Sequence, residues 1–184
     1  MTNKKKIINA LKNNEIVAIP TDTVFGLFIK ISQENMVVLN LFKKRDKDQP
    51  LQVMFPSIEA ALSAIEVNEF QESILREELP GNKSIVVPAN EDFAKKYLHN
   101  QATISLRIPS KVDARTLVEI LETVGPCFAT STNQHGKDML NDYNAVIAYF
   151  PDILVLKGTP GLTVASTIVK LNTDSIEILR GGKK

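Results

Sequence analysis

The stretch from Glu15 to Leu27, which reads EIVAIPTDTVFGL, constrains the fold of this chain more than any other segment. The run from Ile16 to Ile19 is apolar and rich in β-branched residues, which predicts a buried strand. Pro20 ends that strand because proline has no N–H for a strand ladder. Short polar side chains follow at 21–23, and polar groups at the end of a buried strand commonly build a site on an α/β scaffold. The alternative is an ordinary strand and turn whose hydroxyls cap the backbone.

Strand and helix signals alternate along the rest of the chain, which predicts an α/β fold. The N-terminus predicts a first surface helix, and Ser32 is a plausible N-cap for the next helix. Further helices are expected over 58–65, 69–79, 91–98, 114–124 and 142–150, and strands over 28–31, 51–55, 84–87, 103–108, 127–131, 153–156, 163–171 and 176–179. No linker rich in Gly, Ser or Pro divides the chain, so we expect a single domain over residues 1–184.

Composition excludes several classes of protein. The formal net charge of +1 gives no bulk reason to expect binding to nucleic acid or to a membrane. Cys127 is the single cysteine, so an internal disulfide is impossible and a reducing compartment is expected. No apolar run approaches the roughly 20 residues that span a bilayer, and the basic N-terminus lacks the apolar stretch of a secretory signal. We therefore expect a soluble cytoplasmic protein.

Several familiar catalytic and binding motifs are missing. The sequence has no GxxxxGK(S/T) phosphate loop and no GxGxxG. His99, His135 and Cys127 do not have the spacing of metal ligands, so no metal site made by the protein is expected. His135 is interpreted as a loop residue and Cys127 as part of the core.

Cations and hydroxyls remain, each at a predicted strand end or in a turn. Lys43 and Arg45 follow a helix, Arg107 and Arg180 end strands, and 129–136 is a run of hydroxyls and amides. A nucleoside triphosphate carries about four negative charges, so its site needs several converging cations or a metal. The alternative for each residue alone is a solvated charge or a turn cap. Composition and spacing do not establish that these residues converge.

Together, these segments resemble the YrdC/TsaC family over nearly the whole chain and in the same order. Pro20 to Leu27, PTDTVFGL, resembles the PT(D/E)TVYGL signature, with Phe25 in place of tyrosine. The other matching segments are Lys43-Lys44-Arg45 with Pro50-Leu51 (KxR and PL), Leu79-Pro80-Gly81 (PGP-x-T), Arg107-Ile108-Pro109 (RxP), Ser131-Thr132-Asn133 with Gly136 (SAN-x-SG), Ser166-Thr167-Ile168-Val169 (ST(V/I)(V/I)D) and Ile178 to Gly182 (ILRxG).

The resemblance implies L-threonylcarbamoyladenylate synthesis, in which ATP, L-threonine and bicarbonate give threonylcarbamoyl-AMP and pyrophosphate. The product would serve a threonylcarbamoyl transferase complex that modifies adenosine 37 of tRNA to its N6-threonylcarbamoyl form. The implied fold is a single-domain, twisted mixed β-sheet flanked by helices, with a concave electropositive groove for the substrates. The chain is too short for the additional C-terminal domain of longer members.

The resemblance also implies roles for individual residues. The positions matched to threonine or its carbamoylated form are Thr23, Arg107, Ser131 and Ser166, and those matched to ATP are Lys43, Arg45, Gln49, Thr103, Asn133, Asn141 and Arg180. No residue is an obvious covalent nucleophile or base. Catalysis would then consist of positioning and charge stabilisation at phosphorus, with Mg²⁺ expected alongside ATP.

Departures from the family pattern leave other functions open. Met54 stands where longer members have a histidine, Asn82 replaces a proline, and Lys170 replaces an aspartate. Strand alternation predicts that Lys170 shares the face of Ser166. The alternatives are a non-catalytic module that binds double-stranded RNA or takes part in ribosome maturation, and a carbamoyl-adenylate enzyme with a different acceptor.

Overall fold

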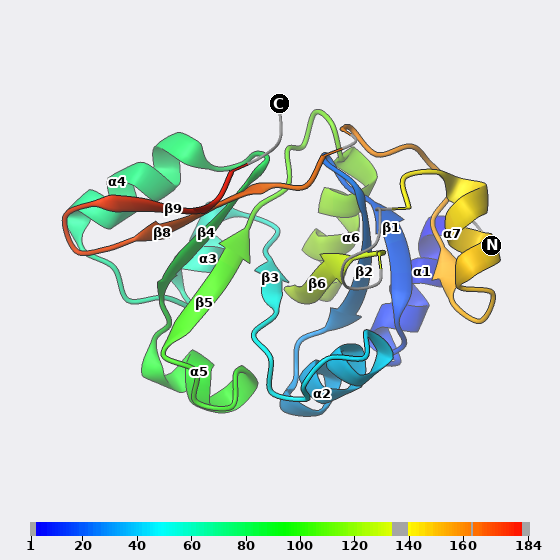
Figure 1. The fold of residues 1–184 in the computed structure, drawn as a ribbon, viewed down its shortest axis with the longest axis horizontal. Coiled ribbons are helices and arrows are strands. Elements are labelled where there is room, and N and C mark those ends of the chain that lie inside the picture. Colours follow the sequence, from blue (N-terminus) through cyan, green and yellow to red (C-terminus); the bar gives the residue numbers. More distant parts are fainter. Residues whose placement is uncertain (1–2, 134–139, 163, 182–184) are drawn as a thin grey trace.

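The computed structural model describes residues 3–133, 140–162 and 164–181 (Figure 1). Its strands are β1 (Val17–Pro20), β2 (Phe25–Lys30), β3 (Gln52–Met54), β4 (Lys83–Pro88), β5 (Thr103–Arg107), β6 (Cys127–Ser131), β7 (Leu154–Val155), β8 (Thr167–Leu171) and β9 (Ile176–Arg180). Its helices are α1 (Asn3–Lys12), α2 (Gln33–Phe42), α3 (Ile58–Leu62), α4 (Glu69–Glu78), α5 (Glu91–Tyr97), α6 (Arg115–Val124) and α7 (Tyr143–Tyr149).

The strands form one nine-stranded sheet in the order β7-β1-β2-β6-β3-β5-β4-β8-β9. The pairs β1–β7, β3–β5 and β4–β8 are parallel, and the other neighbouring pairs are antiparallel. In Figure 1, α7 and β7 lie at one end of the sheet and the β8–β9 hairpin lies at the other. The mixed α/β architecture predicted from the sequence is thus confirmed.

The opening stretch of the sequence folds as a β-hairpin. Strands β1 and β2 pair antiparallel, and Pro20 lies opposite Phe25. The second strand therefore begins at Phe25, not at Phe28 as predicted. Thr21 explains the tight turn between them, because its Oγ1 accepts the backbone N–H groups of Thr23 and Val24 and so returns the chain directly to the sheet.

The other predicted elements are present, with changes at their ends. Ser32 caps α2 as predicted, since its side chain accepts the N–H of Asn35. The helix predicted over 58–65 ends at Leu62, because Ile65 instead forms a β-bridge with Ala89. The strand predicted over 163–171 begins at Thr167, and residue 163, His135 and Gly136 lie outside the described residues.

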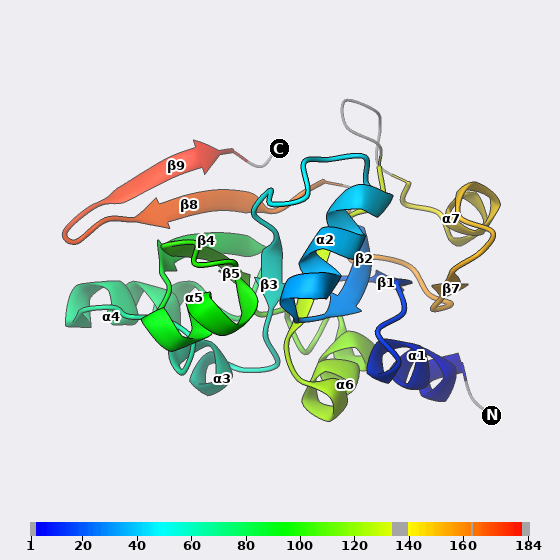
Figure 2. The same ribbon diagram turned by 90° about the horizontal axis from the view of Figure 1, so that it is seen from below.

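Alternation along the strands gives the sheet two different faces. One face carries Leu27, Val53, Ile85, Leu106 and Phe128, which are buried in a core shared with residues of α2, α3, α4 and α7. The alternate residues of β1, β2 and β6 pack against α1 and α6, which lie side by side in Figure 2. On β3, β5, β4 and β8 these alternate positions are largely polar, and Met54 of β3 is the one that belongs to the second core among the described residues.

Cys127 belongs to the core beneath α1 and α6, as predicted. Its side chain is buried, and burial raises the pKa of the thiol to about 12. A thiol that stays protonated at neutral pH is a poor nucleophile, so Cys127 has a structural role.

Candidate active site

A cavity of about 360 Å³ lies over the polar positions of the sheet. Every strand from β2 to β8 along the sheet contributes to it, and β2, β3, β5 and β4 do so with alternate residues, which follows from the two-residue repeat of side chains. The polar or charged side chains that line the cavity are Thr21, Thr23, Gln52, Ser84, Ser105, Arg107, Thr130, Ser131, Ser166 and Arg180. Among the described residues, the lining includes the cations Arg107 and Arg180 but no carboxylate, so the cavity suits a ligand with negative charge.

Arg107, at the end of β5, is buried and held from several sides. Its Nη2 lies 2.5 Å from Oδ1 of Asp22, its Nη1 donates to Thr23 Oγ1 at 2.8 Å, and its Nε donates to the carbonyl of Gly81 at 3.2 Å. A guanidinium has five N–H groups, so N–H groups remain for a ligand. The side chain is therefore fixed in place and can still bind an anion.

Asp22 belongs to the polar stretch at 21–23, but the sequence analysis gave it no individual role. It is buried, and its Oδ2 accepts the backbone N–H of Ser110 at 3.0 Å. Burial raises the pKa of the Asp22 carboxyl, while the charge of Arg107 and the N–H of Ser110 act in the opposite direction. Burial also lowers the pKa of the Arg107 guanidinium, which Asp22 opposes. Each charge thus offsets the desolvation of the other, and Asp22 positions Arg107 from behind the cavity.

Ser131, at the end of β6, accepts a hydrogen bond from Lys43, the residue that follows α2. The Nζ of Lys43 donates to the carbonyl oxygen of Ser131 at 2.6 Å and to that of Asn133. The hydroxyl of Ser131 in turn donates to Oδ1 of Asn133. Burial, together with the nearby charge of Arg45, lowers the pKa of Lys43 to about 8. Lys43 therefore joins the end of α2 to the chain that leaves β6.

Ser166, just before β8, is held through both its side chain and its backbone. Its Oγ lies 2.7 Å from Oγ of Ser84, which also accepts a hydrogen bond from Nε2 of Gln52. Its carbonyl accepts from Nη2 of Arg180 at 2.9 Å. A residue matched to ATP thus contacts a residue matched to threonine, and β3, β4, β8 and β9 all contribute to this part of the cavity.

The structure brings the four residues matched to threonine into one cavity. Thr23, Arg107, Ser131 and Ser166 all line it, although they come from different parts of the chain. Met54, which replaces the histidine of longer members, also lines the cavity. The sequence could not establish this convergence, because it depends on strand pairs that are distant along the chain.

The structure does not bring all of the residues matched to ATP into this cavity. Arg180 lines the cavity. Lys43 and Asn133 do not line it, but both are hydrogen-bonded to Ser131, which does. The residues Arg45, Gln49, Thr103 and Asn141 are not among the described residues that line it. Arg45 is half-buried and Gln49 is exposed, both in the segment that follows α2.

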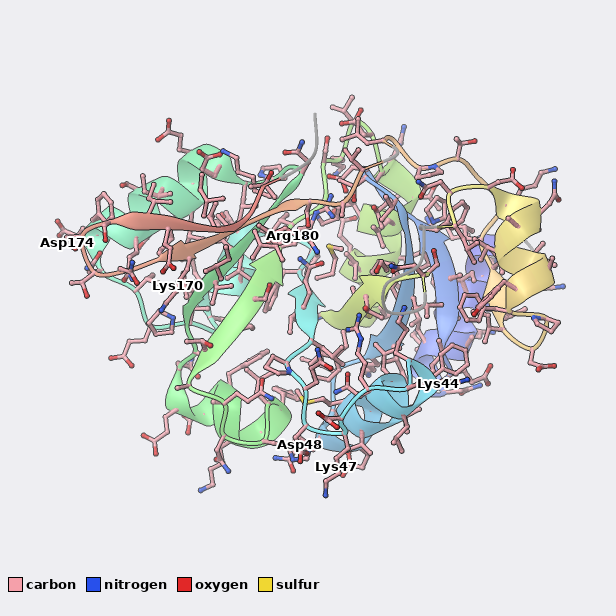
Figure 3. The ribbon with its side chains drawn as sticks, in the orientation of Figure 1. Lys44, Lys47, Asp48, Lys170, Asp174 and Arg180 are labelled. Atoms are coloured by element: carbon pink, nitrogen blue, oxygen red, sulfur yellow. The ribbon has the colours of Figure 1, made fainter. Side chains whose placement is uncertain are left out.

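Thr103 and Lys170 lie in a second hollow, of about 210 Å³, beside the cavity. Val86 lines both spaces, and it pairs with Lys170 across β4 and β8. Lys170 is thus on the predicted face but outside the main cavity. Figure 3 shows Arg180 over the middle of the sheet and Lys170 farther along β8, toward Asp174 at the hairpin. Asn82 lies in a separate hollow with Asp22.

Gln52, Ser84 and Ser105 are further cavity residues that the sequence analysis did not select. Gln52 and Ser105 each lie between two apolar residues of a strand, and Ser84 lies between Lys83 and Ile85 and is buried, so an unpaired polar side chain would be costly there. A polar residue at alternate positions of several predicted strands was the signal that could have identified them. Their common face became apparent only from the sheet order.

Among the described residues, no group of three or more His, Cys, Asp or Glu is placed to hold a metal ion. Nor does any helix in the described ranges have the length and apolar character needed to cross a membrane.

Comparison with solved structures supports the same fold. Pyrococcus abyssi Sua5 in complex with L-threonine matches with a TM-score of 0.84 at 23% identity, over 97% of this chain and 54% of that chain. E. coli YciO matches with a TM-score of 0.81 at 17% identity, over 97% of this chain and 88% of that chain.

Sequence comparison identifies relatives named threonylcarbamoyl-AMP synthase. One from Actinobacillus pleuropneumoniae serotype 3 is 32% identical over 187 residues, which cover 96% of this chain and 98% of the relative. One from Pyrococcus abyssi is 29% identical over 178 residues, which cover 94% of this chain but 52% of the relative, so this chain spans about half of its length.

The Sua5/YciO/YrdC family model, described as "Telomere recombination", matches residues 9–182. This confirms the resemblance found in the sequence: the chain belongs to the Sua5/YciO/YrdC family.

Proposed function

We propose that the chain is a threonylcarbamoyl-AMP synthase that uses L-threonine, bicarbonate and ATP. The observation that carries this proposal is the convergence of Thr23, Arg107, Ser131 and Ser166 on one cavity. Relatives with this printed name, over nearly the full length of both chains in one case, support it further. Transfer of the adenylyl group to the threonine carbamate, with release of pyrophosphate, would make the protein a nucleotidyltransferase.

The side chains in the cavity suit positioning and charge stabilisation. Arg107 would bind the carboxylate of threonine, because a guanidinium matches a carboxylate in bidentate geometry. Arg180 would offset phosphate charge, with Arg45 and Lys43 acting from the segment after α2. Gln49, Thr103, Asn133 and Asn141 complete the proposed nucleotide set. The four cations Arg107, Arg180, Arg45 and Lys43 would together form the electropositive part of the groove.

Mg²⁺ would enter with ATP. Because the cavity lining has no carboxylate among the described residues, the phosphate oxygens and water would supply its ligands. When bound, the ion would neutralise phosphate charge during adenylyl transfer.

The setting of the reaction is part of the same proposal. We place the protein in the cytoplasm, acting as one domain over residues 1–184. Its product would pass to a threonylcarbamoyl transferase complex that acts on tRNA.

Pyrophosphate release tests the proposed function. The complete mixture of ATP, Mg²⁺, L-threonine and bicarbonate should release pyrophosphate, and mass spectrometry should detect threonylcarbamoyl-AMP. Omission of threonine or bicarbonate should abolish both signals, and Ser166→Ala should reduce both while the protein stays folded. Pyrophosphate release that does not depend on threonine would contradict the proposal.

The RNA-binding alternative has its own measurement. A non-catalytic module would bind double-stranded RNA without threonine, and that affinity would fall steeply with salt. Binding of this kind by a protein that makes no threonylcarbamoyl-AMP would favour the alternative.

A further inference from the structure

Gln52, Ser84 and Ser166 form a row of hydrogen bonds along the wall of the cavity. Nε2 of Gln52 donates to Oγ of Ser84, and Oγ of Ser84 lies 2.7 Å from Oγ of Ser166. All three residues line the cavity, and Ser84 and Ser166 are buried. They come from β3, β4 and the segment before β8, so the row joins three separate parts of the chain.

The chemistry of these groups gives the row a direction. The amide nitrogen of Gln52 can only donate, whereas a serine hydroxyl has one proton and two lone pairs. Ser84 accepts from Gln52, and its own proton is then available for Ser166. If Ser166 accepts that proton, the proton of Ser166 remains available to the cavity. The amide therefore favours a Ser166 hydroxyl that donates to a ligand.

Ser131, another hydroxyl matched to threonine, has the opposite polarity. Ser131 donates its proton to Oδ1 of Asn133. Ser131 thus uses its proton within the protein and offers lone pairs, which suit an ammonium or hydroxyl group of a ligand.

We propose that Gln52 is a positioning residue, which acts through Ser84 to keep the Ser166 hydroxyl as a hydrogen-bond donor to the carboxylate of the amino-acid substrate. The inference rests on the proposed function and specifies how the substrate is oriented. A carboxylate accepts hydrogen bonds and carries negative charge, so it matches both a donor at Ser166 and the cation of Arg107. The polarity of Ser131 then suits the opposite end of the amino acid.

The substitution Gln52→Glu tests the direction of the row. A carboxylate at this position accepts from Ser84, so Ser84 accepts from Ser166 and the Ser166 proton turns away from the ligand. The new charge would also repel a carboxylate by itself. The same substitution in the Ser84→Ala background measures this charge effect alone, because without the Ser84 hydroxyl residue 52 is no longer connected to Ser166 by hydrogen bonds.

The affinity for L-threonine is measured by calorimetry without ATP or bicarbonate, so that no carbamate can form. We expect Gln52→Glu to weaken threonine binding about tenfold more in the Ser84 background than in the Ser84→Ala background. Ser84→Thr, which keeps the hydroxyl, should retain the effect. With L-threoninamide, whose neutral amide oxygen is a weaker acceptor than a carboxylate, the difference between backgrounds should shrink. Thermal unfolding of each variant checks that the fold is intact.

The possible failures are distinguishable. Equal losses of threonine affinity in the two backgrounds would overturn the role of Gln52 and leave the proposed function in place. Wild-type protein that binds threonine in neither the presence nor the absence of ATP would contradict the proposed function itself.

Discussion

Nη2 of Arg107 and Oδ1 of Asp22 lie 2.5 Å apart, and both side chains are almost completely buried, with exposures of 4% and 3%. The carboxylate approaches the guanidinium from outside the cavity and also accepts the N–H of Ser110. Asp22 therefore does two things: it offsets the buried charge of Arg107 and sets the direction in which Arg107 faces the cavity.

Removal of Asp22 should destabilise the protein strongly. Asp22→Ala leaves the buried guanidinium of Arg107 without its counter-charge, which we expect to lower the free energy of unfolding by about 3–5 kcal/mol. Urea denaturation measures this loss. The matched variant Asp22→Asn retains a hydrogen-bond acceptor and should lose less stability. A loss below about 1 kcal/mol in Asp22→Ala would show that the pair contributes little.

Lys43 should make stability depend on pH in the alkaline range. Its pKa is lowered from 10.5 to about 8 in the folded protein, so above pH 8 the folded state binds fewer protons than the unfolded state. The free energy of unfolding should therefore rise with pH between about 8 and 10.5, by about 3 kcal/mol in all. Lys43→Met lacks this group, and the difference in unfolding free energy between wild type and variant gives the Lys43 contribution. A difference that stays constant from pH 7 to the alkaline limit would contradict the lowered pKa.

Arg45 and Arg180 should affect the two substrates differently. Arg45→Ala should weaken ATP binding about tenfold and leave threonine binding unchanged. Arg180→Ala should weaken both, because Arg180 also donates to the carbonyl of Ser166. Calorimetric titrations with each substrate distinguish these results, and Lys44→Ala, at an exposed neighbour of Arg45, serves as the control. Unchanged ATP affinity in both arginine variants would remove them from the nucleotide site.

Ser131 and Asn133 should act as a coupled pair. Ser131→Ala should affect threonine more and Asn133→Ala should affect ATP more, each by about 1–3 kcal/mol. Because the Ser131 hydroxyl donates to Asn133, the double variant should lose less than the sum of the two single losses. A double-mutant cycle with both substrates measures this. Strict additivity would indicate that the hydrogen bond does not connect the two sites.

Most secondary structure could be predicted because the local signals agree with the fold. The side chain of Ser32 caps α2 as expected, and the alternating run in β5 is a strand. The β1–β2 hairpin was missed because its turn has no Asn-Gly or Asp-Gly signal. The turn depends instead on the Thr21 hydroxyl, whose contacts cannot be inferred from residue spacing.

The candidate site was less predictable than the elements that carry it. Arg107, Ser131 and Ser166 meet because β6, β3, β5, β4 and β8 are neighbours in the sheet, an order that differs from their order in the chain. Residues close in sequence do not necessarily share the site, as Thr103 and Lys170 demonstrate by lining the adjoining hollow. The family resemblance proposed which residues bind threonine, whereas Asp22, Gln52 and Ser84 became candidates only through their contacts in the structure.

A crystal structure of the protein with L-threonine is the most direct test of the central claim. We predict that the amino acid lies in the main cavity, with its carboxylate within hydrogen-bond distance of the Arg107 guanidinium and the Ser166 hydroxyl. Threonine bound instead in the hollow of Thr103 and Lys170, or bound in the cavity with its carboxylate turned toward Ser131 and away from Arg107, would contradict the account.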